Sequence, residues 1–227
     1  SETRTEFTGS MTPTIADVDG DGVQDIIIHA LNREYVFDGN GNFKSGWPTE
    51  FHTPSYFTNG QIPSAAVSDI DNDGNKEVIT TIRDYYAYNI PSDYSYCFNV
   101  YDNNGNFKSG WPKGCNKDIN VLNDNAYYTL IISDLDGNEN SEIIGVSESY
   151  SGRPTKIQVF NSDGTYFMNW PYEFLGGDAW HDGYNIGQHK TLSIADIDSD
   201  GKKEIIAILN KQDINGEFIG TYLFIWN

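Results

Sequence analysis

The sequence is short of positive charge and of long apolar runs. It contains 227 residues, of which 14 are lysine or arginine and 33 are aspartate or glutamate, so the formal net charge is −19. Nucleic acids and anionic membrane surfaces repel such a polyanion, so no nucleic-acid partner is expected. No run approaches the ~18 apolar residues that a membrane-spanning helix needs. We therefore expect no membrane insertion.

Cysteines and catalytic motifs are also scarce. The only two cysteines, Cys97 and Cys115, flank one expected hairpin, and both a disulfide and two unpaired thiols are compatible with the sequence. No phosphate-binding loop, zinc signature or nucleophile elbow is present. His181 precedes Asp182, but adjacency in sequence does not bring two side chains together for general-base chemistry. These absences favour a non-catalytic protein over an enzyme.

Helical periodicity is absent as well, and turn signals recur about every 8–12 residues, as in all-β proteins. An acidic composition often indicates disorder. Here aromatic residues make up 14% of the chain and isoleucine and valine runs recur throughout it. The sequence therefore predicts a packed, all-β fold.

An acidic loop occurs four times between two apolar runs. The four segments align without a gap: IADVDGDGVQDIII from Ile15, VSDIDNDGNKEVIT from Val67, ISDLDGNENSEIIG from Ile132 and IADIDSDGKKEIIA from Ile194. Their first aspartates are separated by 52, 65 and 62 residues. A period of this size is typical of repeat architectures, including β-propellers.

A second repeated element follows the loop. It reads YVFDGNGNFKSGWPTEF from Tyr35, NVYDNNGNFKSGWPKG from Asn99 and QVFNSDGTYFMNWPYEF from Gln158. Each copy predicts a strand, a glycine-containing turn and a further strand that ends in Trp-Pro, because proline cannot donate to the ladder. Together with strands at Thr14–Ala16 and Asp25–Ala30 around the first loop, one unit has four strands. Trp47, Trp111 and Trp170 repeat at the same position and are expected in the core or at blade edges. Trp226 aligns instead with Phe37 and Tyr101 and is likewise expected to be structural.

Four-stranded units at this period predict a four-bladed β-propeller of antiparallel blades in a single domain, residues 1–227. The blades are expected at about residues 12–51, 63–113, 129–174 and 191–227. The last unit stops at Trp226-Asn227, before its fourth strand. Residues 1–8 resemble the strand-D exits of other units and are expected to complete that blade and close the ring. A fragment of a larger propeller is the competing interpretation.

The acidic loops carry the ligand types that calcium prefers. Ca²⁺ binds six to eight oxygen atoms, and carboxylates on alternate residues of a tight turn can converge on one ion. Counting from the first aspartate as position one, the side chains at positions one, three, five and nine and the backbone at position seven form the expected ligand set. It comprises Asp17, Asp19, Asp21, Val23 and Asp25; Asp69, Asp71, Asp73, Asn75 and Glu77; Asp134, Asp136, Asn138, Asn140 and Glu142; and Asp196, Asp198, Asp200, Lys202 and Glu204. Up to four Ca²⁺ are expected.

An EF-hand does not fit, because its loop needs a glutamate at position twelve between two helices. The pattern between two strands instead resembles the FG-GAP or VCBS repeats of integrin α-subunit propellers and bacterial surface proteins. That resemblance implies a calcium-loaded propeller with structural metals in the loops between the first and second strands. The third loop departs from the pattern, with Asn138 at position five and Glu139 at the position of the bending glycine.

The face opposite the acidic loops is expected to bind ligands. Its connections are rich in aromatic residues beside short polar groups, a combination suited to stacking on sugar rings and bonding their hydroxyls. The alternative is that these aromatics pack the loops onto the blades. The candidate ligand-binding residues are Trp180, His181, Asp182, Tyr184, Tyr56, Tyr86 and Tyr128.

These observations predict a calcium-stabilised, carbohydrate-binding (lectin-like) module of a secreted or cell-surface protein. A larger multidomain protein that contains this module is compatible with the sequence. Extracellular calcium suits loops of moderate affinity. Two alternatives remain: an adhesion module for an extracellular protein ligand, and the propeller of a polysaccharide-degrading enzyme.

Overall fold

The computed structural model describes residues 12–30, 33–50, 65–83, 96–111, 127–147, 156–174, 183–185, 192–213 and 217–227. Throughout these ranges the backbone forms strands, turns and bends, and none of it is helical, so no helix there could cross a bilayer. The expected all-β fold is therefore confirmed. The chain divides into two compact units, Ser1–Leu122 and Asn123–Asn227, which are described separately.

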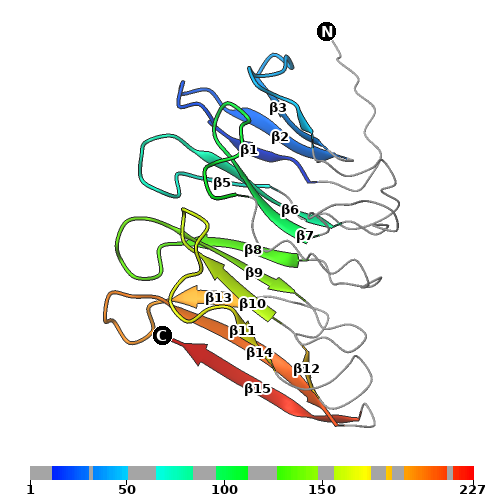
Figure 1. Cartoon of the computed structure of the whole chain (residues 1–227), viewed down its shortest axis with the longest axis vertical. Helices are drawn as coiled ribbons and strands as arrows, with labels where there is room; N and C mark the ends of the chain where they lie inside the picture. The colour runs from blue at the N-terminus through cyan, green and yellow to red at the C-terminus, as the bar shows by residue number, and fades with distance from the viewer. Residues whose placement is uncertain are drawn as a thin grey trace. The chain divides into compact units, whose positions relative to one another are not determined.

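The first unit contains two antiparallel sheets (Figure 1). One is a four-stranded meander in the order β1-β2-β3-β4, and the other has the order β5-β6-β7 in the described residues. The strands are β1 Thr14–Ala16, β2 Asp25–Ala30, β3 Arg33–Phe37, β4 Thr49–Glu50, β5 Ala66–Ser68, β6 Glu77–Arg83 and β7 Tyr96–Tyr101.

The second unit also contains two antiparallel sheets. In the first, the order is β11-β10-β9-β8, and in the second β14 lies between β15 on one edge and both β12 and β13 on the other. The strands are β8 Tyr127–Ser133, β9 Glu142–Ser147, β10 Lys156–Phe160, β11 Tyr172–Glu173, β12 Gly183–Asn185, β13 Leu192–Ala195, β14 Glu204–Gln212 and β15 Phe218–Trp226.

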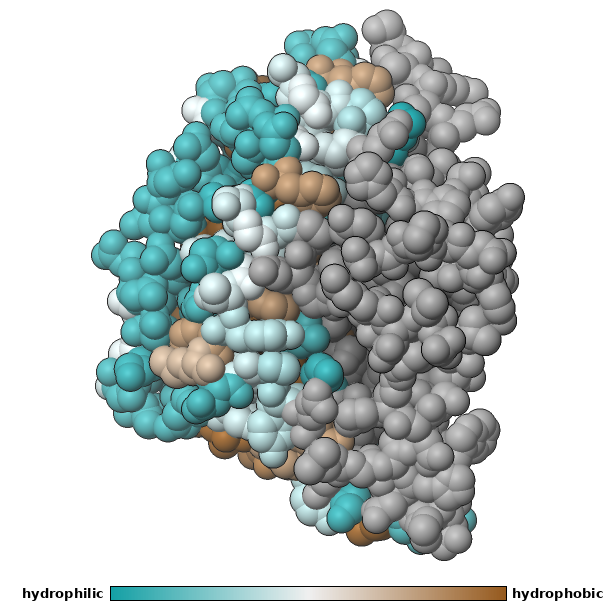
Figure 2. Space-filling model, in the orientation of Figure 1, coloured by the Kyte–Doolittle hydropathy of each residue, from teal (hydrophilic) through white to brown (hydrophobic). Residues whose placement is uncertain are grey.

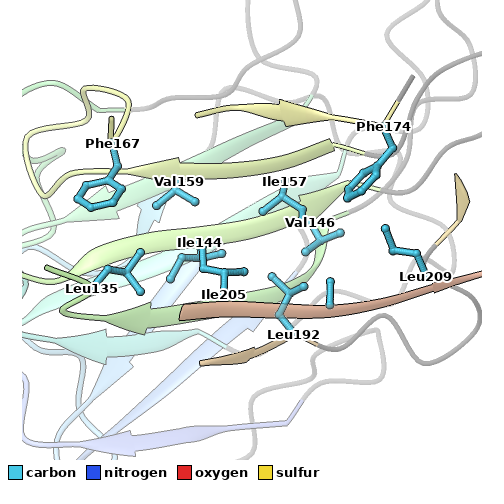
Figure 3. Close-up of a cluster of buried hydrophobic side chains, with 11 residues drawn as sticks. Leu135, Ile144, Val146, Ile157, Val159, Phe167, Phe174, Leu192, Ile205 and Leu209 are labelled. Carbon is cyan, nitrogen blue, oxygen red and sulfur yellow. The ribbon is translucent and has the colours of Figure 1, made fainter. Parts of the chain in front are cut away.

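Each unit buries branched aliphatic and aromatic residues between its sheets, as residues favoured in strands should. In the second unit the core joins β9, β10 and β14 with Leu135 of the acidic loop and Phe167 (Figure 3). In the first unit Val18 of the acidic loop packs with Ile27, Val36 and Trp47. The residue at position two is buried in the first three loops, as Val18, Ile70 and Leu135, whereas Ile197 of the fourth loop is 53% exposed.

The sequence placed several elements correctly. The strands expected at Thr14–Ala16 and Asp25–Ala30 are β1 and β2. Trp226 pairs with Ile205, as Phe37 pairs with Ile26 and Tyr101 with Val78, so its predicted equivalence to those residues is confirmed. The tryptophans are structural, because Trp47 and Trp111 are buried and Trp170 and Trp226 pack against the core.

One strand boundary was wrong. The fourth strand of a unit was expected to end in Trp-Pro, but β4 begins at Thr49 and β11 at Tyr172, directly after that dipeptide. Trp47 instead closes a turn, in which its N–H donates to the carbonyl of Lys44 at 3.1 Å. The tryptophan side chain is therefore positioned by the turn, and the pairing strand starts after the proline.

Some predictions lie outside the described residues. They include the closing strand at residues 1–8, the fourth strand of the second unit after Trp111, and Cys115. Cys97 is placed through the backbone of β7 alone. The disulfide and the ring closure stay predictions.

Candidate metal centres

Each acidic loop brings together three of its carboxylates. Ligand atoms from positions one, three and nine lie within 4.8 Å of one another in every loop, in four groups: Asp17, Asp19 and Asp25; Asp69, Asp71 and Glu77; Asp134, Asp136 and Glu142; and Asp196, Asp198 and Glu204. The side chain at position five is not part of these groups. In Figure 2 the hydrophilic residues of the loops form teal surface at the ends of the strands.

The carboxylate at position nine is buried and fixed by its own loop. Asp25, Glu77, Glu142 and Glu204 each have an exposed fraction of 1% and begin the second strand. In each case one carboxylate oxygen accepts the backbone N–H of position two, at 3.0, 3.0, 2.8 and 2.8 Å in loop order. The second oxygen of the carboxylate takes no part in this bond.

The turn itself is stabilised by the side chains at positions one and five. At position one, Asp17 accepts the N–H groups of Gly20 and Gly22 at 2.8 and 3.0 Å, and Asp196 accepts that of Gly201 at 3.1 Å. At position five, the side-chain oxygen accepts the N–H of position seven in all four loops, at 2.7–2.8 Å. These bonds fold the chain tightly around the cluster.

Positions four and six both adopt left-handed backbone conformations, which favour glycine. Position six is Gly22, Gly74 and Gly201 in three loops, with φ of 86°, 90° and 91°. In the third loop Glu139 takes the same conformation with φ of 73°. The third loop therefore keeps the common turn, with backbone strain at Glu139 in place of a glycine.

Two loops contain an internal cation that the sequence analysis did not identify. The Lys44 ammonium lies 2.5 Å from Asp19 Oδ2 and 3.1 Å from Asp25 Oδ1. In the second loop, the Lys108 ammonium lies 2.8 Å from Asp71 Oδ2 and 2.7 Å from Glu77 Oε1. Both lysines come from the repeated GNFKSGWP element, so its lysine was the available signal.

The lysines stay charged in this environment. Burial opposes the charge on Lys44, but hydrogen bonds to Asp19 and Asp25 outweigh that effect and raise the pKa of the ammonium. The same balance raises the pKa of Lys108. In return, the hydrogen bond from Lys44 lowers the pKa of Asp19.

The third and fourth loops differ in their electrostatics. In the third loop, burial raises the pKa of Glu142 from 4.5 to about 7, helped by the nearby charges of Asp136 and Asp134. Burial also raises the pKa of Glu77, but the hydrogen bond from Lys108 offsets part of that rise. The third loop thus holds negative charges that repel one another, without a lysine from the described residues among them.

The fourth loop leaves a buried polar atom unsatisfied. Glu204 Oε2 accepts the N–H of Ile197, whereas Glu204 Oε1 is buried and has no hydrogen-bond partner. Glu204 belongs to the group formed with Asp196 and Asp198. The nearest lysine in sequence, Lys203, donates to Ser133 at 3.1 Å. Buried carboxylate oxygens seldom remain without a donor or cation.

Most candidate ligand-binding residues lie outside the described residues, namely Trp180, His181, Asp182, Tyr56 and Tyr86. The other two are placed by their backbone alone. Tyr184, in β12, pairs with Lys211, and Tyr128 lies in β8 at a register shift opposite the end of β9. Both positions are at the ends of their sheets away from Glu204 and Glu142.

The sequence analysis also missed a buried ionisable pair. His29 Nδ1 lies 2.6 Å from Glu34 Oε2, and the two side chains are 3% and 0% exposed. They are directly paired across β2 and β3. The negative charge of Glu34 adds to burial in raising the pKa of Tyr101.

No protein-family model matches the sequence, and no curated protein matches it. Among solved structures, similarity is found to the V. cholerae biofilm matrix protein Bap1, at 16% identity and a TM-score of 0.38 over 95% of this chain and 39% of that one. An Agrocybe aegerita lectin that recognises non-reducing terminal N-acetylglucosamine gives 20% identity and a TM-score of 0.47, over 95% of this chain and 53% of the lectin chain. The Dos1 propeller gives 12% identity and a TM-score of 0.43, over 96% of this chain and 51% of that one. The chain spans at most 53% of these three chains, and at such TM-scores the similarities carry no argument about function.

Proposed function

We propose that the chain is a calcium-stabilised binding module in which each acidic loop holds one Ca²⁺. The observation that carries this proposal is the convergence of three carboxylates in each of four loops, with the carboxylate at position nine buried. Like charges at this spacing repel one another, and burial adds several kcal/mol unless a cation is present. A divalent cation would remove both costs.

The ligand chemistry favours calcium. All ligand atoms of the four groups are carboxylate oxygens, whereas structural zinc sites usually contain cysteine or histidine. Ca²⁺ accepts six to eight oxygens in flexible geometry. The side chain of position five and the backbone carbonyl of position seven (Val23, Asn75, Asn140 and Lys202) would complete the set. The bound ion would neutralise charge and fix the turn between two paired strands, so its role is structural.

The experiment that tests metal binding is native mass spectrometry of the protein, titrated with Ca²⁺ and, in parallel, with Mg²⁺. The proposal predicts up to four bound Ca²⁺ and weaker binding of Mg²⁺, which prefers a smaller and more regular site. The absence of any specifically bound Ca²⁺ would contradict it.

In the same proposal the four sheets are blades of a β-propeller, and residues 1–8 add a strand beside β15. The repeated pairing of Phe37, Tyr101 and Trp226 supports equivalent blades. β15 also exposes apolar side chains, including Leu223 at 63% and Ile225 at 46%, which an added strand would help to cover.

The ligand is proposed to be a carbohydrate, bound at the ends of the sheets away from the acidic loops. The support is chemical: Trp180, His181, Asp182, Tyr184, Tyr56, Tyr86 and Tyr128 combine stacking surfaces with hydrogen-bonding groups. A glycan array in the presence of calcium tests this assignment. Binding to no glycan would favour a protein ligand, and turnover of a polysaccharide would favour an enzyme. Either role is proposed for a secreted or cell-surface protein.

A further inference from the structure

The four acidic loops divide into two classes by what enters them from the neighbouring turn. In the first and second loops an ammonium group lies among the carboxylates, from Lys44 and Lys108 respectively. The equivalent residue of the third unit is identified by the backbone. The N–H groups of Lys44, Lys108 and Phe167 donate to Val36, Val100 and Val159 at 2.9, 2.9 and 3.0 Å.

The third loop thus receives a benzyl side chain where the first two receive an ammonium. Phe167 is 8% exposed and lies in the hydrophobic core with Leu135, the position-two residue of the third loop (Figure 3). In the fourth loop, Glu204 Oε1 is buried without a hydrogen-bond partner. The first and second loops therefore carry an ammonium among their carboxylates, whereas Phe167 takes the equivalent place in the third unit and Glu204 of the fourth loop keeps a buried oxygen without a hydrogen-bond partner.

The lysines occupy the oxygens that a metal would need. Lys44 contacts positions three and nine of the first loop, and Lys108 contacts the same two positions of the second, at 2.5–3.1 Å. Calcium would lie about 2.3–2.6 Å from those oxygens. The two cations compete for these oxygens, because even two unit charges ~4 Å apart repel one another by about 4 kcal/mol near a protein surface and Ca²⁺ carries two.

We propose that Lys44 and Lys108 are resident cations of the first and second loops, which bind Ca²⁺ only by displacing them and therefore more weakly than the fourth loop. This inference rests on the proposed function for the identity of the metal. The module then has two kinds of site. The fourth loop needs calcium to neutralise its carboxylates, whereas in the first and second loops a lysine neutralises them when calcium is low.

The test isolates the two lysine-containing loops. In the background Glu142→Gln with Glu204→Gln, the third and fourth loops lose their buried charge but keep an oxygen that can accept the N–H of position two. Calcium affinity is then measured by isothermal titration calorimetry, with and without Lys44→Met and Lys108→Met. We expect the lysine substitutions to tighten binding by at least about tenfold.

A control with the same charge change is Lys156→Met with Lys211→Met. These lysines lie on β10 and β14, at the ends away from the acidic loops. If the control tightens binding as much as the Lys44 and Lys108 pair, or if neither pair changes the affinity, the inference is overturned. As a reciprocal test, Phe167→Lys should weaken calcium binding to the third loop relative to Phe167→Met.

A second measurement separates this inference from the proposed function. In EDTA, Lys44→Met with Lys108→Met should lower the melting temperature below that of the Lys156 and Lys211 control, because the first two loops lose the ammonium group that pairs with their carboxylates. An equal melting temperature would overturn the inference even if calcium binds. Conversely, if no variant binds calcium, the proposed function fails. A lower melting temperature of Lys44→Met with Lys108→Met in EDTA would still identify these lysines as the resident cations.

Discussion

The Glu142 side chain accepts the backbone N–H of Leu135, seven residues earlier, at 2.8 Å. The same bond joins positions nine and two in all four loops. In the first three loops it links a buried carboxylate to a residue whose side chain is also buried, whereas Ile197 of the fourth loop is 53% exposed. The position of each of the first three acidic clusters is therefore set by hydrophobic packing on one side and by the strand on the other.

The raised pKa of Glu142 predicts a pH-dependent stability of the calcium-free protein. The pKa is about 7 in the folded state and 4.5 ordinarily, so the folded protein binds a proton that the unfolded chain has lost between those values. Stability should consequently fall as pH rises through this window, by up to about 3 kcal/mol. This fall is measured by urea unfolding in EDTA at several pH values, for the wild type and for Glu142→Gln.

Glu142→Gln should be less sensitive to pH in this window, because glutamine has no carboxyl to titrate. Glu217→Gln is a suitable control, since Glu217 is exposed and lies outside the four acidic groups. Identical pH profiles for the wild type and Glu142→Gln would contradict the assignment of the effect to Glu142.

Glu204→Gln should remove one bound Ca²⁺ while leaving the calcium-free protein folded. The amide oxygen can still accept the N–H of Ile197, but the buried negative charge is lost. Native mass spectrometry should show one ion fewer, and the melting temperature should fall in calcium but change little in EDTA. A variant that retains the full number of ions at wild-type affinity would show that Glu204 is not a ligand.

Glu139→Gly should stabilise the protein by about 1 kcal/mol, because glycine tolerates the left-handed conformation that glutamate adopts there at a cost. The backbone angle φ at Glu139 is 73°. Glu139→Ala removes the same charge but keeps the strain, so it controls for electrostatics. If alanine and glycine stabilise the protein equally in urea unfolding, charge accounts for the effect and strain does not.

Gly46→Ala should destabilise the first unit strongly. A Cβ atom at Gly46 would lie 1.8 Å from the backbone oxygen of Asn104, so the β3–β4 turn could not keep its contact with the turn after β7. Gly20→Ala has a similar φ of 73° but open space around it. Gly20→Ala should lower the free energy of unfolding by about 1 kcal/mol. Gly46→Ala should lower it several times more, as measured by urea unfolding of both variants. Equal costs would mean that the close approach is not maintained in solution.

Deletion of residues 1–8 should lower the melting temperature and speed amide hydrogen exchange along β15. The proposed closing strand would protect the edge of β15 and cover apolar side chains such as Leu223. Unchanged exchange along β15 would remove the support for closure by residues 1–8.

The sequence predicted the repeated part of the fold well, since acidic loops, glycine turns and Trp-Pro fall at fixed places in each unit. Strands β1 and β2 follow directly from those signals. The start of β4 was misplaced because Trp47 closes a turn, and its N–H bond to Lys44 has no local signature in the sequence.

The candidate metal centres were predictable in part, because the acids also recur at fixed places in each unit. The spacing of acids identifies which carboxylates converge at positions one, three and nine. It cannot identify Lys44 or Lys108, which reach the loops from a turn two strands further along the chain. Nor does periodicity indicate the His29–Glu34 pair, which depends on the register of β2 and β3.

The most direct test of the central claim is the melting temperature of the wild-type protein in excess EDTA and in millimolar Ca²⁺. If each acidic loop binds a structural Ca²⁺, calcium should raise the melting temperature by several degrees or more, since a bound ion stabilises the folded state alone. Mg²⁺ at the same concentration should raise it less. An unchanged melting temperature in EDTA and in calcium would contradict the account.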